Sequence, residues 1–380
     1  MLEFLEEKSG EKKVEFLELI YDLIFVYVIG RNNSLLHAME DGFIGAETYL
    51  TYALTTLIIL QIWYFTTLFI NRYGGNGLQE HICIFINMYL LYYMADGTRI
   101  HWQSYYVRYN LAWGLILLNL AVQYYLKLRT AREHAPWESF HIRHSMRLLL
   151  IEAAVVLISI PLYPLMHIPL SPLAMMFGMA AALLSGRTNS LVSVDFPHLT
   201  ERVMLYVVFT FGEMIIGIAG YFGGGFTLSS IYFSLMAFLI VVGLFQTYGY
   251  FYDHVIDRET PNAGTGYMTI HIFLIAALNN ITAALEFMRE PAVRQIPKNA
   301  FLVASIVVYM LFLFLLEKYA RVQARCSRRF YGQIVLLCVA FAILMAATYR
   351  YPAVSIAVTV IFIYTLYAML YYREKKQRQS

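Results

Sequence analysis

The chain has 380 residues, of which 59% are hydrophobic and only 14% are charged, and its formal net charge at pH 7 is +3. A soluble domain carries about 25% charged residues, so this composition excludes an ordinary soluble protein. The small net charge gives no sign of a nucleic-acid-binding surface, and we expect no nucleic-acid partner.

Long apolar runs predict a helical membrane protein. A hydrocarbon core of about 30 Å takes roughly 20 apolar residues as helix, and only helices or closed barrels satisfy their backbone groups in lipid. The runs have helix length rather than the short alternation of barrel strands. About twelve segments are predicted to span the membrane, near residues 14–37, 45–71, 79–97, 105–128, 144–164, 170–187, 198–221, 227–254, 266–287, 299–320, 331–348 and 352–372.

Lys and Arg residues predict the orientation of these spans. With the N-terminus inside the cell, about three quarters of the 28 Lys and Arg residues fall on the cytoplasmic side. This is the positive-inside asymmetry, and it favours an even number of spans with both termini in the cytoplasm. We therefore expect a multi-pass protein of the cell membrane that contacts membrane lipids.

Two stretches of the chain resemble each other. Residues 81–96 and 271–286 both begin with His-Ile and both end in an acidic residue. His81 and His271 each precede that acid by 15 residues. This similarity indicates that the two halves of the chain are copies.

Acidic residues upstream of these histidines support the same repeat. Asp22 precedes the first histidine by 59 residues, and Glu213 precedes the second by 58. The spacing predicts two six-helix repeats, residues 1–190 and 191–380. Because six is an even number of spans, both repeats would insert with the same polarity, as the parallel repeats of some transporters do.

The first predicted span carries three acids in the stretch VEFLELIYDLIFVYVI. Glu15, Glu18 and Asp22 fall within about 60° of one another around a helix, so they share one face. A charge at bilayer depth costs roughly 2.5–3.5 kcal/mol, which makes Asp22, the deepest, a candidate functional residue. For Glu15 and Glu18, a solvated helix start is the alternative.

The seventh predicted span, residues 198–220, carries a second group. Arg202 lies eleven residues before Glu213 and about 20° away around the helix, so both share a face. His198 and Glu201 are one turn apart at the helix start, where a local capping pair and a functional pair both remain open. A hydrogen-bonded structural acid is the alternative for Glu213.

Histidine and asparagine complete the candidates. A histidine titrates near pH 6.5, so His81 and His271, each paired with an acid of its own half, would exchange protons near neutral pH. Interfacial or core hydrogen bonding is the alternative for both. Asn279 lies in the middle of a span, where it either faces a cavity or holds helices together.

By these motifs the chain resembles the low temperature requirement protein A (LtrA) family. The family's first-span pattern E-L-x-x-D-L-x-F-V is similar to residues 18–26. Its H-x-x-E-R … G-E stretch is matched by His198, Glu201, Arg202, Gly212 and Glu213. The resemblance covers most of the chain, but the family name describes a growth phenotype and implies no reaction or substrate.

The sequence favours a transporter-like protein that moves a small solute, with proton coupling, through a cavity between its halves. The candidate residues are Glu18, Asp22, His81, Glu201, Arg202, Glu213, His271 and Asn279. The alternatives are a membrane-embedded enzyme acting on a lipid or isoprenoid, and a structural protein with dry, fully paired acids. We find no Walker, HExxH, GxSxG or cysteine metal motif, and we expect no cofactor and no metal.

Overall fold

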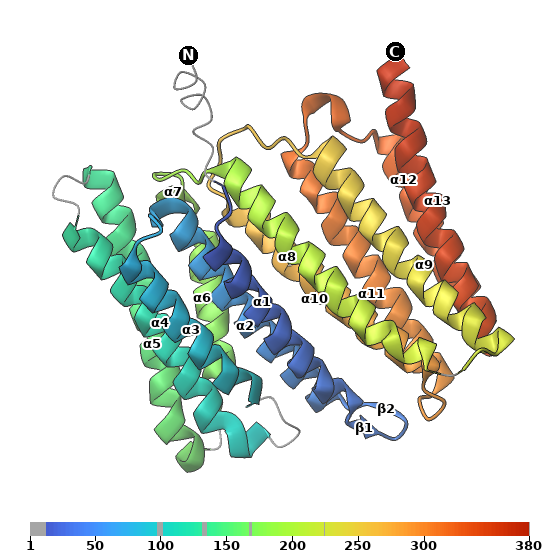
Figure 1. Ribbon diagram of the computed structural model, residues 1–380, viewed down its shortest axis with the longest axis horizontal. Coiled ribbons are helices and arrows are strands. Elements are labelled where there is room, and N and C mark those ends of the chain that lie inside the picture. Colours follow the sequence, from blue (N-terminus) through green and yellow to red (C-terminus); the bar gives the residue numbers. More distant parts are fainter. Residues whose placement is uncertain (1–12, 97–101, 131–134, 167–168, 224, 380) are drawn as a thin grey trace. The chain divides into compact units, whose positions relative to one another are not determined.

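The computed structural model describes residues 13–96, 102–130, 135–166, 169–223 and 225–379 (Figure 1). Nearly all of these residues are helical. The α-helices are α1 (Phe16–Asn33), α2 (Ala46–Tyr73), α3 (Leu78–Asp96), α4 (Trp102–Thr130), α5 (Pro136–Met166), α6 (Ser171–Leu184), α7 (Gly186–Asn189), α8 (Phe196–Gly217), α9 (Leu228–Tyr250), α10 (Thr265–Arg289), α11 (Gln295–Leu315), α12 (Arg328–Thr348) and α13 (Pro352–Gln379).

Shorter elements connect the helices. They are the 3₁₀ helices η1 (Ser34–His37), η2 (Ile218–Phe222), η4 (Leu316–Tyr319) and η5 (Val322–Ala324), the π-helix η3 (Phe251–Val255), and the strands β1 (Met39–Glu40) and β2 (Phe43–Ile44). The strands pair antiparallel across Asp41 and Gly42, which both have positive φ, as a two-residue hairpin turn requires. Gly42 O accepts a 2.8 Å hydrogen bond from Arg294 N, which holds this hairpin against the connection between α10 and α11.

The prediction of an all-α membrane protein is confirmed. Each predicted span contains one α-helix, and nine helices within the described residues are long and apolar enough to cross a membrane. The other three are α1, α3 and α6. α1 carries three charged residues among its 18, and α6 has only 14 residues.

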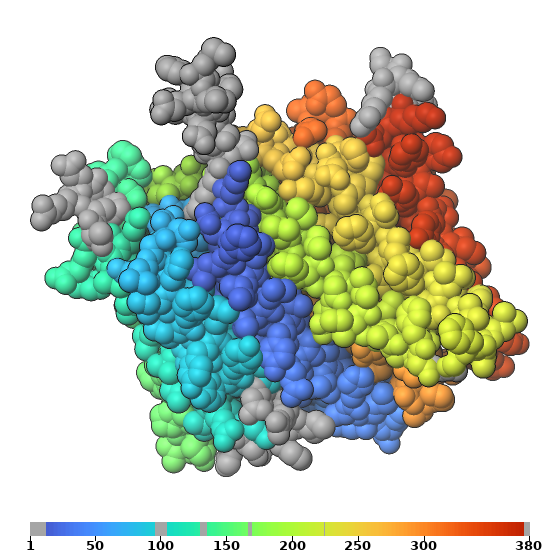
Figure 2. Space-filling view, viewed as in Figure 1, coloured from blue at the N-terminus to red at the C-terminus, as the bar shows by residue number. Residues whose placement is uncertain are grey.

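Apolar side chains cover the outside of several helices. On α12, only 22% of the most apolar window is buried, and Val335, Leu336 and Ile343 are all more than 60% exposed. A helix with so much exposed apolar surface is suited to a lipid environment rather than to water. Other faces are buried: Figure 2 shows the side chains of α9 directly against those of α13.

Contacts group the described residues into two units that alternate along the sequence. Unit 1 lies within Met1–Asn32, Ala53–Tyr206 and Arg258–Thr269, and unit 2 lies within Asn33–Tyr52, Val207–Asp257 and Ile270–Ser380. In unit 1, α4 packs against α3 and α5, and α6 packs against α5. In unit 2, α13 packs against α9 and α12, and α11 packs against α12. The predicted repeats, divided at residue 190, remain a prediction.

Candidate functional site

Four titratable side chains of α1 and α8 meet inside unit 1. Glu18 and Asp22 are four residues apart on α1, and His198 and Arg202 are four residues apart on α8. Residues at i and i+4 are neighbours on one helix face, so each helix presents two adjacent groups. All four residues are at most 3% exposed. We call them the buried cluster.

Asp22 and Arg202 form the central ion pair of the buried cluster. Arg202 Nη2 lies 2.9 Å from Asp22 Oδ1, and Arg202 Nε lies 3.1 Å from Oδ2. This two-point geometry matches the guanidinium fork to the carboxylate. Trp63 on α2 donates a third hydrogen bond, from Nε1 to Oδ1 at 3.0 Å. Its ring stacks on Tyr206, one turn after Arg202, with 4.4 Å between centroids.

Glu18 is the second carboxylate of the buried cluster. Its Oε2 lies 3.1 Å from His198 Nε2 and 3.8 Å from Arg202 Nη1. Arg202 is therefore close to two carboxylates, but its short, two-point contact is with Asp22. His198 is the nearer partner of Glu18.

Neighbouring groups select the tautomer of the neutral His198 ring. The backbone N–H of Asp195 donates to Asn71 Oδ1 at 2.9 Å, which identifies the other amide atom of Asn71 as the NH₂ donor. That Nδ2 lies 2.9 Å from His198 Nδ1, so Nδ1 accepts a hydrogen bond. In the neutral ring, the proton then resides on Nε2, facing Glu18.

The buried cluster holds two carboxylates and one guanidinium. Asp22 makes the two-point contact with Arg202, and Glu18 lies near both His198 and Arg202. Burying a carboxylate is costly, so a second carboxylate beside a single guanidinium is a candidate site for binding a proton.

Both contacts of the cluster have the same sequence offset. Glu18 meets His198 and Asp22 meets Arg202, each across 180 residues. Equal offsets at two successive turns require the helices to run in the same direction where they touch. α1 and α8 are thus parallel neighbours in unit 1.

Five other predicted residues lie outside the buried cluster. Glu201 is exposed on α8, and Glu213 is half-buried further along the same helix, in unit 2. His81 Nε2 lies 2.6 Å from Asn76 Oδ1. His271 is fully buried, with Nε2 3.2 Å from the Tyr248 hydroxyl. Asn279 donates to the carbonyl of Ile275 in its own helix.

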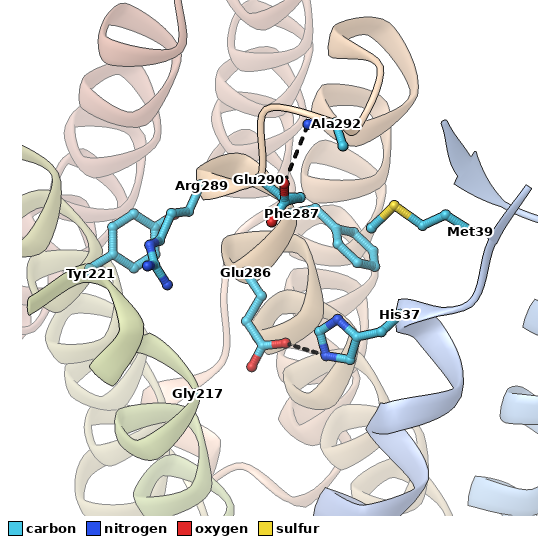
Figure 3. A pocket seen from close by; sticks show the side chains of 9 residues that line it. All are labelled: His37, Met39, Gly217, Tyr221, Glu286, Phe287, Arg289, Glu290 and Ala292. Atoms are coloured by element: carbon cyan, nitrogen blue, oxygen red, sulfur yellow. Dashed lines mark hydrogen bonds and ion pairs between the residues drawn. The ribbon is translucent and has the colours of Figure 1, made fainter. Parts of the chain in front are cut away.

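A cavity of about 450 Å³ opens in unit 2. Its lining includes His37 and Met39 after α1, Gly217 on α8, and Glu286 and Arg289 on α10. Figure 3 shows Glu286 and His37 pointing toward each other across it, joined by a contact of 3.2 Å between Oε2 and Nε2. We call it the His37 cavity.

The His37–Glu286 pair can hold a proton. The hydrogen bond to Glu286 raises the pKa of His37, and partial burial opposes that shift less strongly. The side chains are 56% and 26% exposed, so the pair is in contact with the cavity. Acid–histidine pairs therefore occur in both units. The Glu18–His198 and His37–Glu286 pairs each join a residue before position 190 to one after it, whereas a third pair, His254–Glu374 at 3.4 Å, lies entirely after that position.

A glycine on α8 allows α10 to approach this cavity closely. A Cβ at Gly217 would lie 2.6 Å from Thr282 Cγ2 and 2.9 Å from Glu286 Oε1. Glu213, one turn earlier on α8, interacts electrostatically with Glu286. The Glu213 and Glu286 carboxylates are therefore neighbours along the α8–α10 contact.

Sequence reasoning found some of these residues and missed others. It selected Glu18, Asp22 and Arg202, which the structure brings together. It left His198 open and did not select Trp63, His37 or Glu286. The aligned stretch at residues 271–286 ends in Glu286, which was the available signal for that residue.

Among the described residues, no group of three or more His, Cys, Asp or Glu side chains lies close enough together to hold a metal ion. The three cysteines are free thiols; Cys83 is buried and the other two are partly buried.

α1 and α8 lie within a part of the chain that matches a known protein family. Residues 13–367 match the family described as bacterial low temperature requirement A protein (LtrA). The chain belongs to the LtrA family. The match includes both helices of the buried cluster and all residues of the His37 cavity. No curated protein gives a significant match to this LtrA protein.

Proposed function

We propose that this LtrA protein is a transporter that couples proton binding at the buried cluster to movement of a small solute across the cell membrane. The observation that carries the proposal is the second carboxylate. The Asp22–Arg202 pair alone would hold α1 against α8. Glu18 adds a buried negative charge that a purely structural contact does not need.

Protonation changes what surroundings the cluster prefers. Binding one proton at a carboxylate raises the charge of the cluster by one unit and replaces a buried ion with a neutral group. Removing an ion from water costs several kcal/mol even after relaxation, so the charged form favours access to water and the neutral form favours a closed site. If water reaches the cluster in one state of the protein and not in the other, the proton affinity of the cluster differs between the two states. Coupling of proton binding to transport requires such a difference.

The proposed architecture is two parallel six-helix repeats with both termini in the cytoplasm. The parallel direction of α1 and α8 supports it, because these helices are the first and seventh spans, which are the first spans of the two proposed repeats. Basic residues at the end of α4, Lys127 and Arg129, support the orientation under the positive-inside rule. The solute would pass between the repeats, and membrane lipids surround them.

Glu18→Gln is the sharpest test, because it removes the charge of the second carboxylate and leaves the Asp22–Arg202 pair in place. Glu15→Gln is the matched control on α1 and Glu201→Gln on α8, since both side chains are exposed. A metabolite comparison of cells with and without the protein identifies the solute. Solute uptake is then measured with and without a protonophore.

We expect Glu18→Gln protein to reach wild-type membrane yield while solute accumulation loses its dependence on the proton gradient. Both controls should accumulate solute as the wild type does. Gradient-driven accumulation by Glu18→Gln at the wild-type rate would reject proton coupling at this cluster. Rescue of the deletion phenotype with no change in any metabolite would reject transport itself.

A further inference from the structure

A second cavity of unit 2, about 330 Å³ in volume, lies where several helices begin or end. It shares Tyr221 and Arg289 with the His37 cavity. Figure 3 shows Arg289 beside Tyr221, away from the His37–Glu286 pair. The polar side chains that line the second cavity come from three helices: Ser229 and Ser230 from α9, Arg289 from α10, and Gln295 and Lys298 from α11.

The lining of this second cavity has a net positive charge. Arg289 and Lys298 both line it, and none of the described lining residues is acidic. Within the described part of the chain, no hydrogen bond or ion pair engages the Arg289 guanidinium. Glu290 acts on Lys298 electrostatically, but it lines the His37 cavity rather than this one.

Lys298 is held at the wall of this cavity by burial and by a hydrogen bond. Its residue is only 2% exposed, and Nζ donates to the carbonyl of Glu290 at 3.2 Å. An ammonium group has three donors, so two remain for a ligand. Gly220 makes room for the second cation, because a side chain there would collide with the Arg289 guanidinium.

The helix starts around the cavity add to its positive potential. Ser229 and Ser230 lie in the first turn of α9, Gln295 begins α11, and Pro352 begins α13. The N-terminus of each helix carries a partial positive charge. These helix ends add to the positive potential of Arg289 and Lys298, which supply most of the positive charge of the cavity.

We propose that this cavity binds the phosphoryl group of an organic phosphate. Cations and hydroxyls arrive from three helices, and donors from several directions suit a tetrahedral oxyanion with several acceptor oxygens. The volume exceeds what one phosphate fills, and Tyr221, Phe233 and Met288 provide an apolar wall for an organic substituent. A soluble phosphate monoester and an anionic lipid headgroup share this chemistry.

Binding is measured on the purified full-length protein as a ligand-induced rise in thermal midpoint, at constant ionic strength. One arm adds glycerol 3-phosphate, with chloride as the comparison. The other adds phosphatidylglycerol, with phosphatidylcholine as the comparison. A rise in the first arm alone identifies a soluble ligand, and a rise in the second alone identifies a lipid. Each outcome supports the oxyanion site.

Arg289→Gln and Gly220→Ala change the cavity without removing buried Lys298. Arg289→Gln should weaken apparent affinity about ten- to hundredfold, the loss expected for one charge-assisted hydrogen bond. Gly220→Ala should weaken it less, because its Cβ displaces the flexible end of Arg289 without removing the charge. Arg294→Gln is the matched control, an exposed arginine that does not line the cavity, and should bind as the wild type does. The proposal fails if neither phosphate raises the midpoint, or if Arg289→Gln and Arg294→Gln respond alike. It does not depend on proton coupling.

Discussion

Removing either partner of the Asp22–Arg202 pair should destabilise the protein, but by unequal amounts. Arg202→Gln leaves two buried carboxylates, at positions 18 and 22, with no guanidinium between them. Breaking a buried ion pair in this way costs about 3–5 kcal/mol. Asp22→Asn leaves Arg202 with Glu18, whose Oε2 is 3.8 Å from Nη1. Its cost is that of weakened charged hydrogen bonds, about 1.5–3 kcal/mol.

The double variant makes this argument sharper. Asp22→Asn combined with Arg202→Gln removes one negative and one positive charge, so the net charge of the cluster stays that of the wild type. The double variant should therefore be more stable than Arg202→Gln alone. The assay heats each purified variant in detergent and measures the folded fraction by size-exclusion chromatography. We expect midpoints in the order wild type, Asp22→Asn, double variant, Arg202→Gln. An Arg202→Gln midpoint equal to that of Asp22→Asn, or above that of the double variant, would refute the charge count.

Three further predictions follow from single contacts. The raised pKa of His37 means that its bond to Glu286 stabilises the fold fully below about pH 6.5 and is lost as pH rises through the raised value. The thermal midpoint should therefore fall over that range in the wild type, and a His37→Gln variant with the same fall would contradict this. Gly217→Ala should destabilise the folded protein by about 1–3 kcal/mol, because the added Cβ meets Thr282 and Glu286. Gly212→Ala on the same helix is the control, because a Cβ there has no atom within 4 Å. Equal thermal midpoints for the two variants would show that α8 and α10 relax freely. Single cysteines at Arg129 and Arg325 should resist impermeant thiol reagents applied outside the cell, and rapid labelling of both would reverse the orientation.

The sequence was sufficient to locate the charged face of α1. Three acids inside an apolar run stand out because lipid penalises each of them. Glu15 is exposed, Glu18 is 3% exposed and Asp22 is fully buried, which follows the expected order of depth. Helix positions were also predictable, since the apolar runs set them.

Side-chain partners were not predictable from spacing. Asp22 lies 180 residues from Arg202 and 41 from Trp63, and neither separation has a periodic signature. The aligned histidines show the limit of spacing arguments. His81 bonds an asparagine five residues away and His271 lies against Tyr248, whereas the acid–histidine pairs use His198, His37 and His254.

The charges that weaken α1 as a membrane helix also determine how it packs. Each ionised carboxylate adds roughly 2.5–3.5 kcal/mol to the cost of placing α1 in lipid alone. That cost is offset where α8 supplies His198 and Arg202, which match Glu18 and Asp22 turn for turn, and where α2 supplies the Trp63 hydrogen bond to Asp22. A shift of α8 by one turn would leave one group of each helix unpaired. The buried charges therefore specify the partner of α1, its register and its direction.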